Sequence, residues 1–308
     1  MESWEPPELV LRRVALAEGW SDDELDRRVR RGELTRLRPG AYLPGTHDRD
    51  PTVRHRRLVV ATLAALRRPA VVSHQSAAVL HGLPLWGVPL DRVHVTRRPP
   101  ASSDAGRHLR CHVARLPDDD VVQTSGVAAT APARTLLDLA RALPFEPAVA
   151  LLDAALRRRV IEPVALAERA ALLGRLPGAR SAMRAVRFAD GRSESVGESR
   201  SRVLLSQLGM APSALQLEVH GHGTLIGRVD FGWEHEWVLG EFDGRVKYGR
   251  LLRPGQAPGD VVFEEKRRED ALRDEDWGVV RWTWGELHPG VLGPRVNRAL
   301  ERGRRRQA

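Results

Sequence analysis

The sequence of 308 residues is poor in cysteine and lysine and has no long apolar run. Its single cysteine, Cys111, excludes an internal disulfide and a zinc site built on several thiolates. No stretch approaches the roughly 20 uninterrupted apolar residues that a membrane-spanning helix needs. Residues 1–7 are acidic and contain proline, so they lack the basic start and apolar run of a signal peptide. We therefore expect a cytoplasmic protein with no membrane partner.

Basic residues outnumber acidic ones, 49 against 40, which gives a net charge of +9. Such a charge suits a polyanionic partner such as nucleic acid. Only Lys247 and Lys266 are lysine, and so strong an arginine bias is also typical of a coding preference that places arginine on solvated faces. The charge alone is therefore weak support for nucleic-acid binding. The two retained lysines indicate that a compact ammonium group is needed in the C-terminal part.

The length predicts two or three domains, because a single core rarely extends over so many residues. We predict an α/β and α+β multidomain architecture. A winged helix-turn-helix domain covers residues 1–50, an α+β middle domain covers 51–180, and an α/β domain covers 190–308. We place the linker before the last domain in the short basic segment between residues 178 and 190.

The first 45 residues predict two helices followed by a short hairpin, which is the layout of a winged helix-turn-helix. Ser21, with Glu24 three residues on, is typical of a capping box that begins the second helix, over 22–31. A hairpin over 34–43 follows it. The alternative is a small helical domain that holds a protein partner. Phosphate contacts are expected from the arginines of the second helix and the wing, namely Arg27, Arg28, Arg30, Arg31, Arg36 and Arg38.

The middle region is α+β and carries several histidines. His74 and His81 lie seven residues apart and could share one face of a helix. Capping and packing explain them better than a metal ion, because no acidic ligand is near them in the sequence. His94, His108 and His112 fall on short strands and a loop, and we interpret them as surface or packing residues.

After residue 190 the pattern predicts the order helix, strand, strand, strand, helix, strand, helix. Glu198 falls in the first turn of the first helix. Asp230 lies at the end of the second strand, and Glu241 lies near the end of the third. Asp243 follows where that strand breaks into a loop. These four acids form the candidate site.

Strand geometry allows these acids to meet at one divalent cation. Adjacent strands lie about 4.8 Å apart, so the carboxylates of Asp230 and Glu241 can reach one ion, and alternation places Asp243 on the same face as Glu241. Oxygen ligands suit Mg²⁺ or Mn²⁺, which polarises a phosphate oxygen and lowers the pKa of an attacking water. Glu198 could supply a further ligand, and Lys247 could stabilise charge on the phosphate.

Four ordered motifs lie between residues 228 and 282. They are Arg228-Val229-Asp230-Phe231, Gly240-Glu241-Phe242-Asp243-Gly244, Glu265-Lys266-Arg267-Arg268-Glu269-Asp270 and Trp277-Gly278-Val279-Val280-Arg281-Trp282. The set resembles the very-short-patch-repair-like endonucleases, a branch of the PD-(D/E)XK superfamily. The resemblance implies a restriction-endonuclease-like fold, with Asp230 and Glu241 as metal-binding acids and Glu198 as the helix glutamate of the superfamily.

The C-terminal sequence departs from that family at the motif lysine. Asp243 stands where the superfamily usually has lysine, so Lys247 or Lys266 is the candidate to replace it. A nuclease fold that only binds is the alternative, since a fold does not fix a function.

Six short motifs lie in order along the N-terminal and middle parts. They are Gly19-Trp20-Ser21 with Leu25, Arg31-Gly32-Glu33-Leu34, Arg38-Pro39-Gly40-Ala41-Tyr42, Ser73-His74-Gln75-Ser76-Ala77-Ala78, His81-Gly82-Leu83-Pro84 and Ala133-Arg134-Thr135-Leu136-Leu137-Asp138-Leu139. They resemble the AbiEi antitoxin family of abortive-infection toxin–antitoxin systems. That resemblance implies a winged-helix head that binds DNA and represses its own operon, and it suggests a cognate toxin protein as a partner.

These observations predict a DNA-binding protein with a metal-dependent endonuclease domain that hydrolyses phosphodiester bonds, in a phage-defence or toxin–antitoxin context. The head would locate the duplex and the C-terminal site would cut it. The alternative is a non-catalytic antitoxin or transcriptional repressor that uses the nuclease fold as a scaffold. A structural partner that binds a toxin protein is a third possibility.

Overall fold

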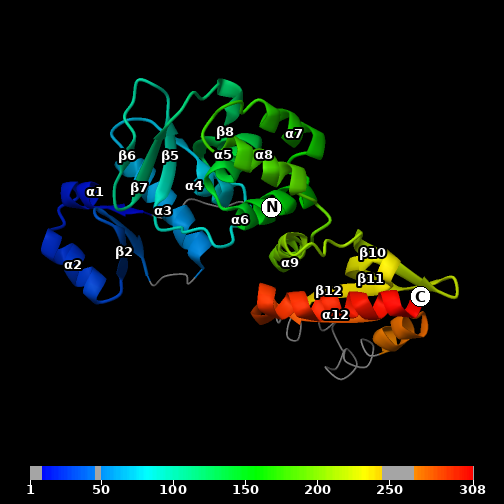
Figure 1. The fold of residues 1–308 in the computed structure, drawn as a ribbon. Helices are drawn as coiled ribbons and strands as arrows, with labels where there is room; N and C mark the ends of the chain where they lie inside the picture. Colours follow the sequence, from blue (N-terminus) through cyan, green and yellow to red (C-terminus); the bar gives the residue numbers. More distant parts are fainter. Residues whose placement is uncertain (1–8, 46–49, 245–266, 308) are drawn as a thin grey trace. The chain divides into compact units, whose positions relative to one another are not determined.

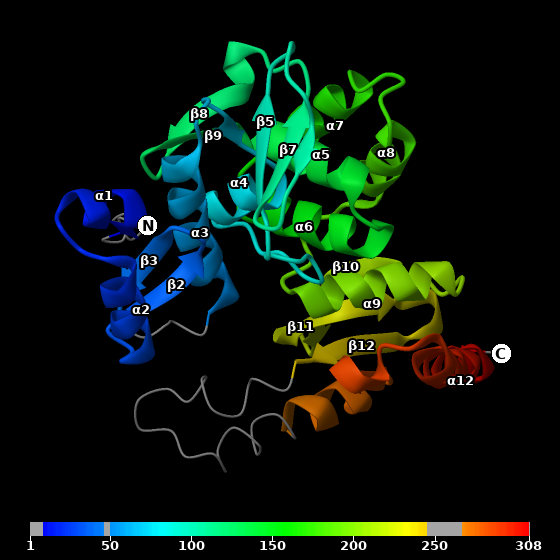
Figure 2. The ribbon, with the colours of Figure 1, turned by 90° about the vertical axis from the view of Figure 1, so that its left-hand side faces the viewer.

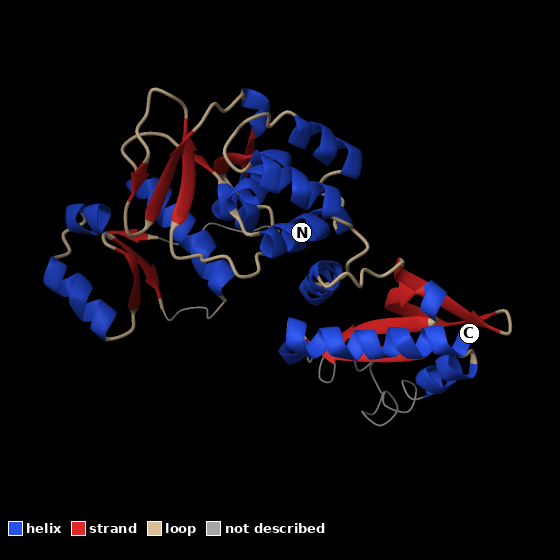
Figure 3. Ribbon diagram, viewed as in Figure 1, coloured by secondary structure: helices blue, strands red, loops and turns tan. Residues whose placement is uncertain are grey.

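The computed structural model describes residues 9–45, 50–244 and 267–307. Lys247 and Lys266, the candidate motif lysines, lie outside the described residues. The chain divides into two compact units: the first comprises residues 1–151 and 160–187, and the second comprises 152–159 and 188–308. Helices and three sheets make up the described part, so the architecture is mixed α/β (Figures 1 and 3). None of the helices described there combines the length and apolar character required to cross a bilayer.

The N-terminal part of the first unit forms two helices and a three-stranded sheet. Oγ of Ser21 accepts the N–H of Glu24 at 3.1 Å, as expected for a helix N-cap. The first helix begins only at Arg12, because Val10–Leu11 pair with the last strand of the hairpin and complete the sheet. The elements are β1 (Val10–Leu11), α1 (Arg12–Ala17), α2 (Asp22–Arg30), β2 (Leu34–Arg38) and β3 (Ala41–Pro44).

A six-stranded sheet with the order β6-β7-β5-β4-β9-β8 forms the rest of the first unit, together with its helices. β5 and β7 are parallel neighbours, and their buried Val95 and Cys111 pack in one core with Leu58 and Val59 of α3. The strands are β4 (Val71–Val72), β5 (Val93–Arg97), β6 (Asp104–Ala105), β7 (Leu109–Val113), β8 (Val121–Thr124) and β9 (Val127–Thr130). The helices are α3 (Pro51–Ala65), α4 (His74–Leu80), α5 (Pro132–Ala142), α6 (Phe145–Arg157, which ends in the second unit), α7 (Pro163–Ala171) and α8 (Ala179–Phe188).

Helix α3 joins the N-terminal sheet to the six-stranded part. Ala61 of α3 is fully buried and packs against Leu37, Ala41 and Leu43 of the hairpin. The two parts therefore share a core, in agreement with their assignment to one unit. The basic segment after residue 178 is also ordered in this unit, as α8, with Ala182 and Ala185 fully buried.

The second unit has a four-stranded sheet with the order β10-β11-β12-β13. Strand β11 is antiparallel to both of its neighbours, β10 and β12, whereas β12 and β13 are parallel. The parallel pair requires a crossover from the end of β12 to the start of β13, and this crossover includes helical residues 267–274. The predicted order of helices and strands is therefore present. The elements are α9 (Val196–Gln207), β10 (Ala214–Gly221), β11 (Thr224–Trp233), β12 (Val238–Asp243), β13 (Gly278–Thr283) and α12 (Pro289–Gln307).

Two cores lie on opposite faces of this sheet. On one face, Leu205 of α9 and Leu292 of α12 pack with Trp233 and Trp282 of the sheet. On the other, Leu272 packs against Leu239 and neighbouring strand residues. Figure 2 shows α9 on one side of the sheet and the orange helix of residues 267–274 on the other. Of the acids of the candidate site, Glu198 lies at the start of α9 and contacts Gln216 together with Asp230, whereas Glu241 contacts Arg268 of the helix over 267–274.

Candidate functional site

The N-terminus of α9 holds the carboxylate of Glu198 in place. Ser195, the N-cap, accepts the N–H of Glu198 at 3.1 Å and donates its hydroxyl to Oε1 of that side chain at 2.8 Å. The N–H of Glu194 donates to Oε2 at 2.7 Å. Only 7% of Glu198 is exposed. The cap thus fixes both the helix and its acid.

Gln216 connects Glu198 to Asp230. Its Nε2 lies 3.0 Å from Oε2 of Glu198 and 3.3 Å from Oδ1 of Asp230. Gln216 has a φ of 53°, and the register of β10 with β11 passes from Leu215↔Phe231 to Leu217↔Val229. This left-handed residue interrupts the ladder, and its amide lies between the two carboxylates.

The two carboxylates repel each other. The pKa of Glu198 is raised to about 7, first by burial of the carboxyl group and then by the negative charge of Asp230. The hydrogen bonds from Glu194 and Ser195 act in the opposite direction but do not cancel this effect. Glu198 therefore exchanges its proton nearer to neutral pH than an ordinary glutamate does. A buried acid with such a pKa beside a second acid is typical of a functional site.

Glu241 is held by two arginines. Nη2 of Arg268 lies 2.6 Å from Oε1, and Nε of Arg281 lies 2.8 Å from Oε2. Arg281 is the residue that pairs with Glu241 in the parallel ladder of β12 and β13, and its Nη1 also forms a 2.9 Å ion pair with Glu269. Both oxygens of Glu241 are thus engaged with cationic side chains.

The ladder of β11 with β12 ends at the pair Phe231↔Gly240, so Asp230 and Glu241 occupy the next position of the register, just beyond the paired part. Among the described residues, the acids Glu198, Asp230, Glu241 and Asp243 contribute no group of three ligand atoms within 4.8 Å of one another. The structure brings Glu198 and Asp230 together through Gln216, and it holds Glu241 through arginines, which the sequence analysis did not anticipate.

The arginines predicted to contact nucleic acid differ in exposure. Arg27, Arg30, Arg31 and Arg36 are exposed, whereas Arg28 and Arg38 are half-buried. Arg28 lies 4.0 Å above the ring of Trp20 and forms a 2.8 Å hydrogen bond with Glu24. Burial lowers the pKa of Arg38, whose Nε has no hydrogen-bond partner. The exposed members are the better placed to reach phosphates.

The sequence analysis missed a cluster of histidines in the first unit. His74, His94 and His112 place ligand nitrogens within 4.8 Å of one another. Their pKa values are lowered to about 2, 3 and 4, respectively, because burial disfavours the charged rings. The three residues come from α4, β5 and β7, and only the parallel pairing of β5 with β7, absent from the prediction, would have placed the last two side by side.

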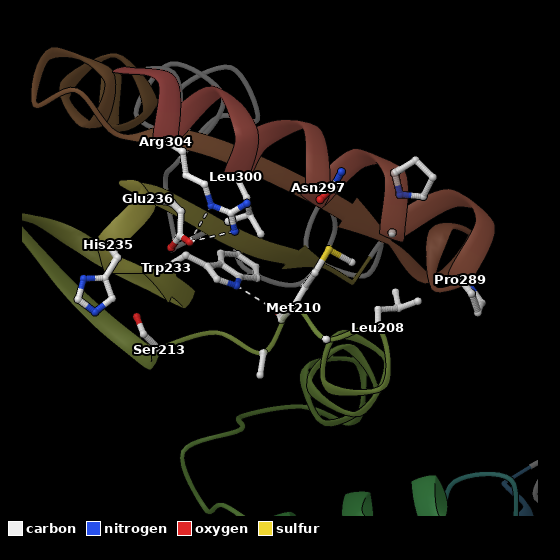
Figure 4. A pocket seen from close by; sticks show the side chains of 14 residues that line it. Leu208, Met210, Ser213, Trp233, His235, Glu236, Pro289, Asn297, Leu300 and Arg304 are labelled. Carbon is white, nitrogen blue, oxygen red and sulfur yellow. Dashed lines mark hydrogen bonds and ion pairs between the residues drawn. The ribbon is translucent and has the colours of Figure 1, made fainter. Parts of the chain in front are cut away.

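A pocket of about 810 Å³ lies in the second unit, between the end of α9 and helix α12 (Figure 4). Trp233 forms part of its wall and donates Nε1–H to the carbonyl of Met210 at 3.1 Å. An ion pair between Arg304 and Glu236 closes one side at 3.2 Å. None of the four acids of the candidate site lines this pocket, so it is distinct from the predicted metal site.

Comparisons with known proteins give relatives without a described activity. No family model matches the chain. It is 34% identical over 189 residues to two proteins of Mycobacterium tuberculosis, "Uncharacterized protein MT2308" of strain CDC 1551 / Oshkosh and "Uncharacterized protein Rv2248" of strain ATCC 25618 / H37Rv. The match covers 59% of this chain and 65% of each relative. The crystal structure of the RV2827C protein from the same species matches with 18% identity and a TM-score of 0.37, over 70% of this chain and 82% of that one.

Proposed function

We propose that the chain binds DNA and hydrolyses its phosphodiester bonds with a divalent metal ion held in the second unit. The observation that carries the proposal is the pair of acids Glu198 and Asp230. They share the amide of Gln216, and their repulsion helps to raise the pKa of Glu198 to about 7. The order of helices and strands around them supports a restriction-endonuclease-like fold.

The donor set fits a hard cation. Carboxylate oxygens are ligands that Mg²⁺ and Mn²⁺ prefer, and a dication beside Glu198 and Asp230 would relieve their repulsion. Such an ion, when bound, supplies Lewis-acid stabilisation of the phosphate and a more acidic water. Glu198 can accept or release a proton near neutral pH. Glu241 would join the ligands only after leaving Arg268 or Arg281. The role proposed for Lys247 concerns a residue outside the described part.

The head supports the nucleic-acid part of this proposal. α2 and the hairpin carry the exposed guanidinium groups of Arg27, Arg30, Arg31 and Arg36. Arg27 pairs with Glu24 at 3.0 Å, and exposed pairs of this kind cost little to break, about 0–1 kcal/mol. These side chains are therefore available for phosphates, and we propose that the head positions the chain on the duplex.

A second candidate function is non-catalytic. The observation that favours it is the ion-pair network on Glu241, which engages one of the two predicted metal-binding acids with two arginines. In that case the second unit is a binding scaffold, and the chain acts as a DNA-binding repressor or antitoxin. The cognate toxin suggested by the AbiEi resemblance belongs to this alternative.

A plasmid-nicking assay separates the two functions. The chain is incubated with supercoiled plasmid and Mg²⁺ or Mn²⁺, and wild type is compared with Asp230→Ala. The matched control is Asp274→Asn, because Asp274 is an exposed acid of the same unit. We expect nicking by wild type and control and its loss in Asp230→Ala. Equal nicking by all three proteins would show a contaminant, and the absence of nicking, with DNA binding retained, would favour the repressor.

A further inference from the structure

The histidine cluster joins three elements of the first unit. His74 is the first residue of α4, His94 lies on β5, and His112 lies on β7. In the parallel register Thr96 is opposite His112, and His94 and Thr96 lie on one face of β5 because side chains alternate along a strand. Both strand histidines therefore project from the same face of the sheet, where they meet the N-terminus of α4.

The inner nitrogens of two rings face each other. Nδ1 of His94 lies 3.0 Å from Nε2 of His112. No carboxylate belongs to the group. Each of the three side chains is only half-buried, so the cluster is accessible from solvent. One of the two facing nitrogens of His94 and His112 carries the proton of their hydrogen bond, so both can bind one metal ion only after that proton moves to the outer nitrogen of its ring or to water.

Polar side chains hold the outer nitrogens. The side-chain amide of Gln75 lies 2.7 Å from Nε2 of His94. Oγ of Ser73 lies 3.0 Å from Nδ1 of His74 and also accepts the hydroxyl of Thr96 at 2.8 Å, which leaves Nε2 of His74 for a ligand. Metal-binding histidines usually donate their second N–H to an acceptor, which fixes the tautomer and the ring orientation. Oγ of Ser73 can accept from His74, and Gln75 can accept from His94 once its side-chain amide turns its oxygen, in place of its nitrogen, toward Nε2.

We propose that His74, His94 and His112 form a binding site for one divalent transition-metal ion, with Zn²⁺ as the best-fitting member of the class. Imidazole nitrogens suit zinc, copper and nickel, whereas Mg²⁺ requires oxygen. Three nitrogen ligands leave a fourth position of tetrahedral zinc for water or another ligand. The ion would join the start of α4 to two strands of the sheet. This site is separate from the acids of the second unit and does not rest on the proposed nuclease.

The ring positions define the movement that binding requires. With zinc–nitrogen distances near 2.0–2.1 Å, ring centroids of a tetrahedral site lie about 5 Å apart. The ring centroid of His94 lies 5.8 Å from that of His74 and 5.1 Å from that of His112. The rings of His74 and His112, however, are stacked, with their centroids only 3.8 Å apart. Binding therefore requires His74 to leave this stack, so that its lone pair turns toward the other two nitrogens.

A gain-of-signal experiment with Co²⁺ tests the site in the full-length chain. Co²⁺ replaces zinc and absorbs strongly in a tetrahedral nitrogen site, and excess Mg²⁺ occupies oxygen-ligand sites. In His94→Cys the sulfur takes the place of Nδ1, the nitrogen closer to the backbone. We expect a thiolate-to-cobalt charge-transfer band in the near ultraviolet that wild type lacks. The matched control is His108→Cys, which adds a thiol outside the cluster.

Two further measurements complete the test. We expect Zn²⁺ to bind wild type with one ion per chain and to raise its Tm, and we expect His112→Ala to lose both effects. Gln75→Leu, which keeps the three ligands, should weaken binding by about 10- to 100-fold. The proposal is overturned if His94→Cys gives no new band, if His108→Cys gives the same band, or if His112→Ala binds zinc as wild type does.

Discussion

The backbone N–H of Phe242 on β12 donates to Oδ2 of Asp230 on β11 at 2.8 Å. This hydrogen bond lies just beyond Phe231↔Gly240, the last residue pair of the two strands. The carboxylate thus takes the place of a backbone acceptor at the point where β11 and β12 separate. Its other oxygen contacts Gln216, which also contacts Glu198. Asp230 therefore has two roles: it ends the ladder, and it sets the electrostatic environment of Glu198.

Replacing Asp230 by asparagine should lower the pKa of Glu198. The substitution keeps the size of the side chain and an oxygen that can accept the backbone N–H of Phe242. It removes the negative charge that disfavours ionisation of Glu198. We expect the pKa to fall from about 7 toward, but not to, the ordinary value, because burial is the larger cause and is unchanged. Titration of ¹³C-labelled glutamate by NMR measures it. An unchanged pKa would contradict the proposed pairing of the two acids.

Glu198 should also make stability depend on pH. Its pKa of about 7 in the folded state lies above the ordinary value of 4.5. Between these values the folded protein keeps a proton that the unfolded chain has released, so the free energy of unfolding should fall as pH rises from 4.5 to 7. The shift corresponds to at most about 3 kcal/mol.

The variant Glu198→Gln isolates this dependence. Glutamine does not ionise, so the variant should lose less stability than wild type over the same pH range, and its relative stability should increase with pH. Urea unfolding at pH 5, 6 and 8 measures the difference. Parallel curves for the two proteins would contradict the raised pKa.

Local sequence signals predicted more of the fold than of the site. The cap at Ser21, the hairpin after it and the order of elements around β10–β13 were predicted, because each depends on neighbouring residues or on periodicity. The position of Gln216 depends on an irregular residue in β10, and the histidine cluster depends on the parallel register of β5 with β7. Neither feature can be deduced from neighbouring residues in the sequence. The two arginines that contact Glu241 could not be predicted either, because they lie 27 and 40 residues away from it in the chain.

Gly197 should be required for the acid pair. A Cβ at this position would lie 1.9 Å from Cε1 of Phe242, so α9 can approach β12 only without a side chain there. Gly197→Ala should displace either the ring or the helix that carries Glu198. We expect a loss of about 1–3 kcal/mol from overpacking and reduced nicking.

The double variant Gly197→Ala with Phe242→Leu provides the control, since the smaller side chain returns space. Chemical denaturation measures all three proteins. If Gly197→Ala alone is as stable as wild type, the close packing of α9 on β12 is not as described.

Two arginines of α2 should differ in their effects on DNA binding and on stability. Arg30→Ala removes an exposed guanidinium, so DNA affinity should fall and the salt slope should decrease by about one. Arg28→Ala removes a group that is held by Trp20 and Glu24, so its main effect should be on stability. Fluorescence anisotropy with duplex DNA at several salt concentrations, together with thermal unfolding, measures both. The same salt slope in wild type and Arg30→Ala would count against a phosphate contact.

Asp153→Asn should destabilise the second unit by leaving a buried cation without its counter-charge. Both oxygens of Asp153 accept Nη2 of Arg202, at 2.8 and 2.7 Å, and the carboxylate also accepts the N–H of Asp190 at 2.7 Å. Asp153 is fully buried and Arg202 nearly so. Removing one partner of a buried pair costs about 3–5 kcal/mol, because the remaining charge stays out of water.

The exposed pair of Arg98 with Asp118 supplies the control for Asp153→Asn. Because both of its side chains are largely exposed, Asp118→Asn should leave stability unchanged. Guanidinium denaturation followed by far-ultraviolet circular dichroism reports on both units, so both variants can be compared with wild type. A double variant, Asp153→Leu with Arg202→Met, should recover most of the loss, since it removes the unpaired charge. Equal stability of Asp153→Asn and wild type would show that water reaches Arg202 and that the pair is not buried in solution.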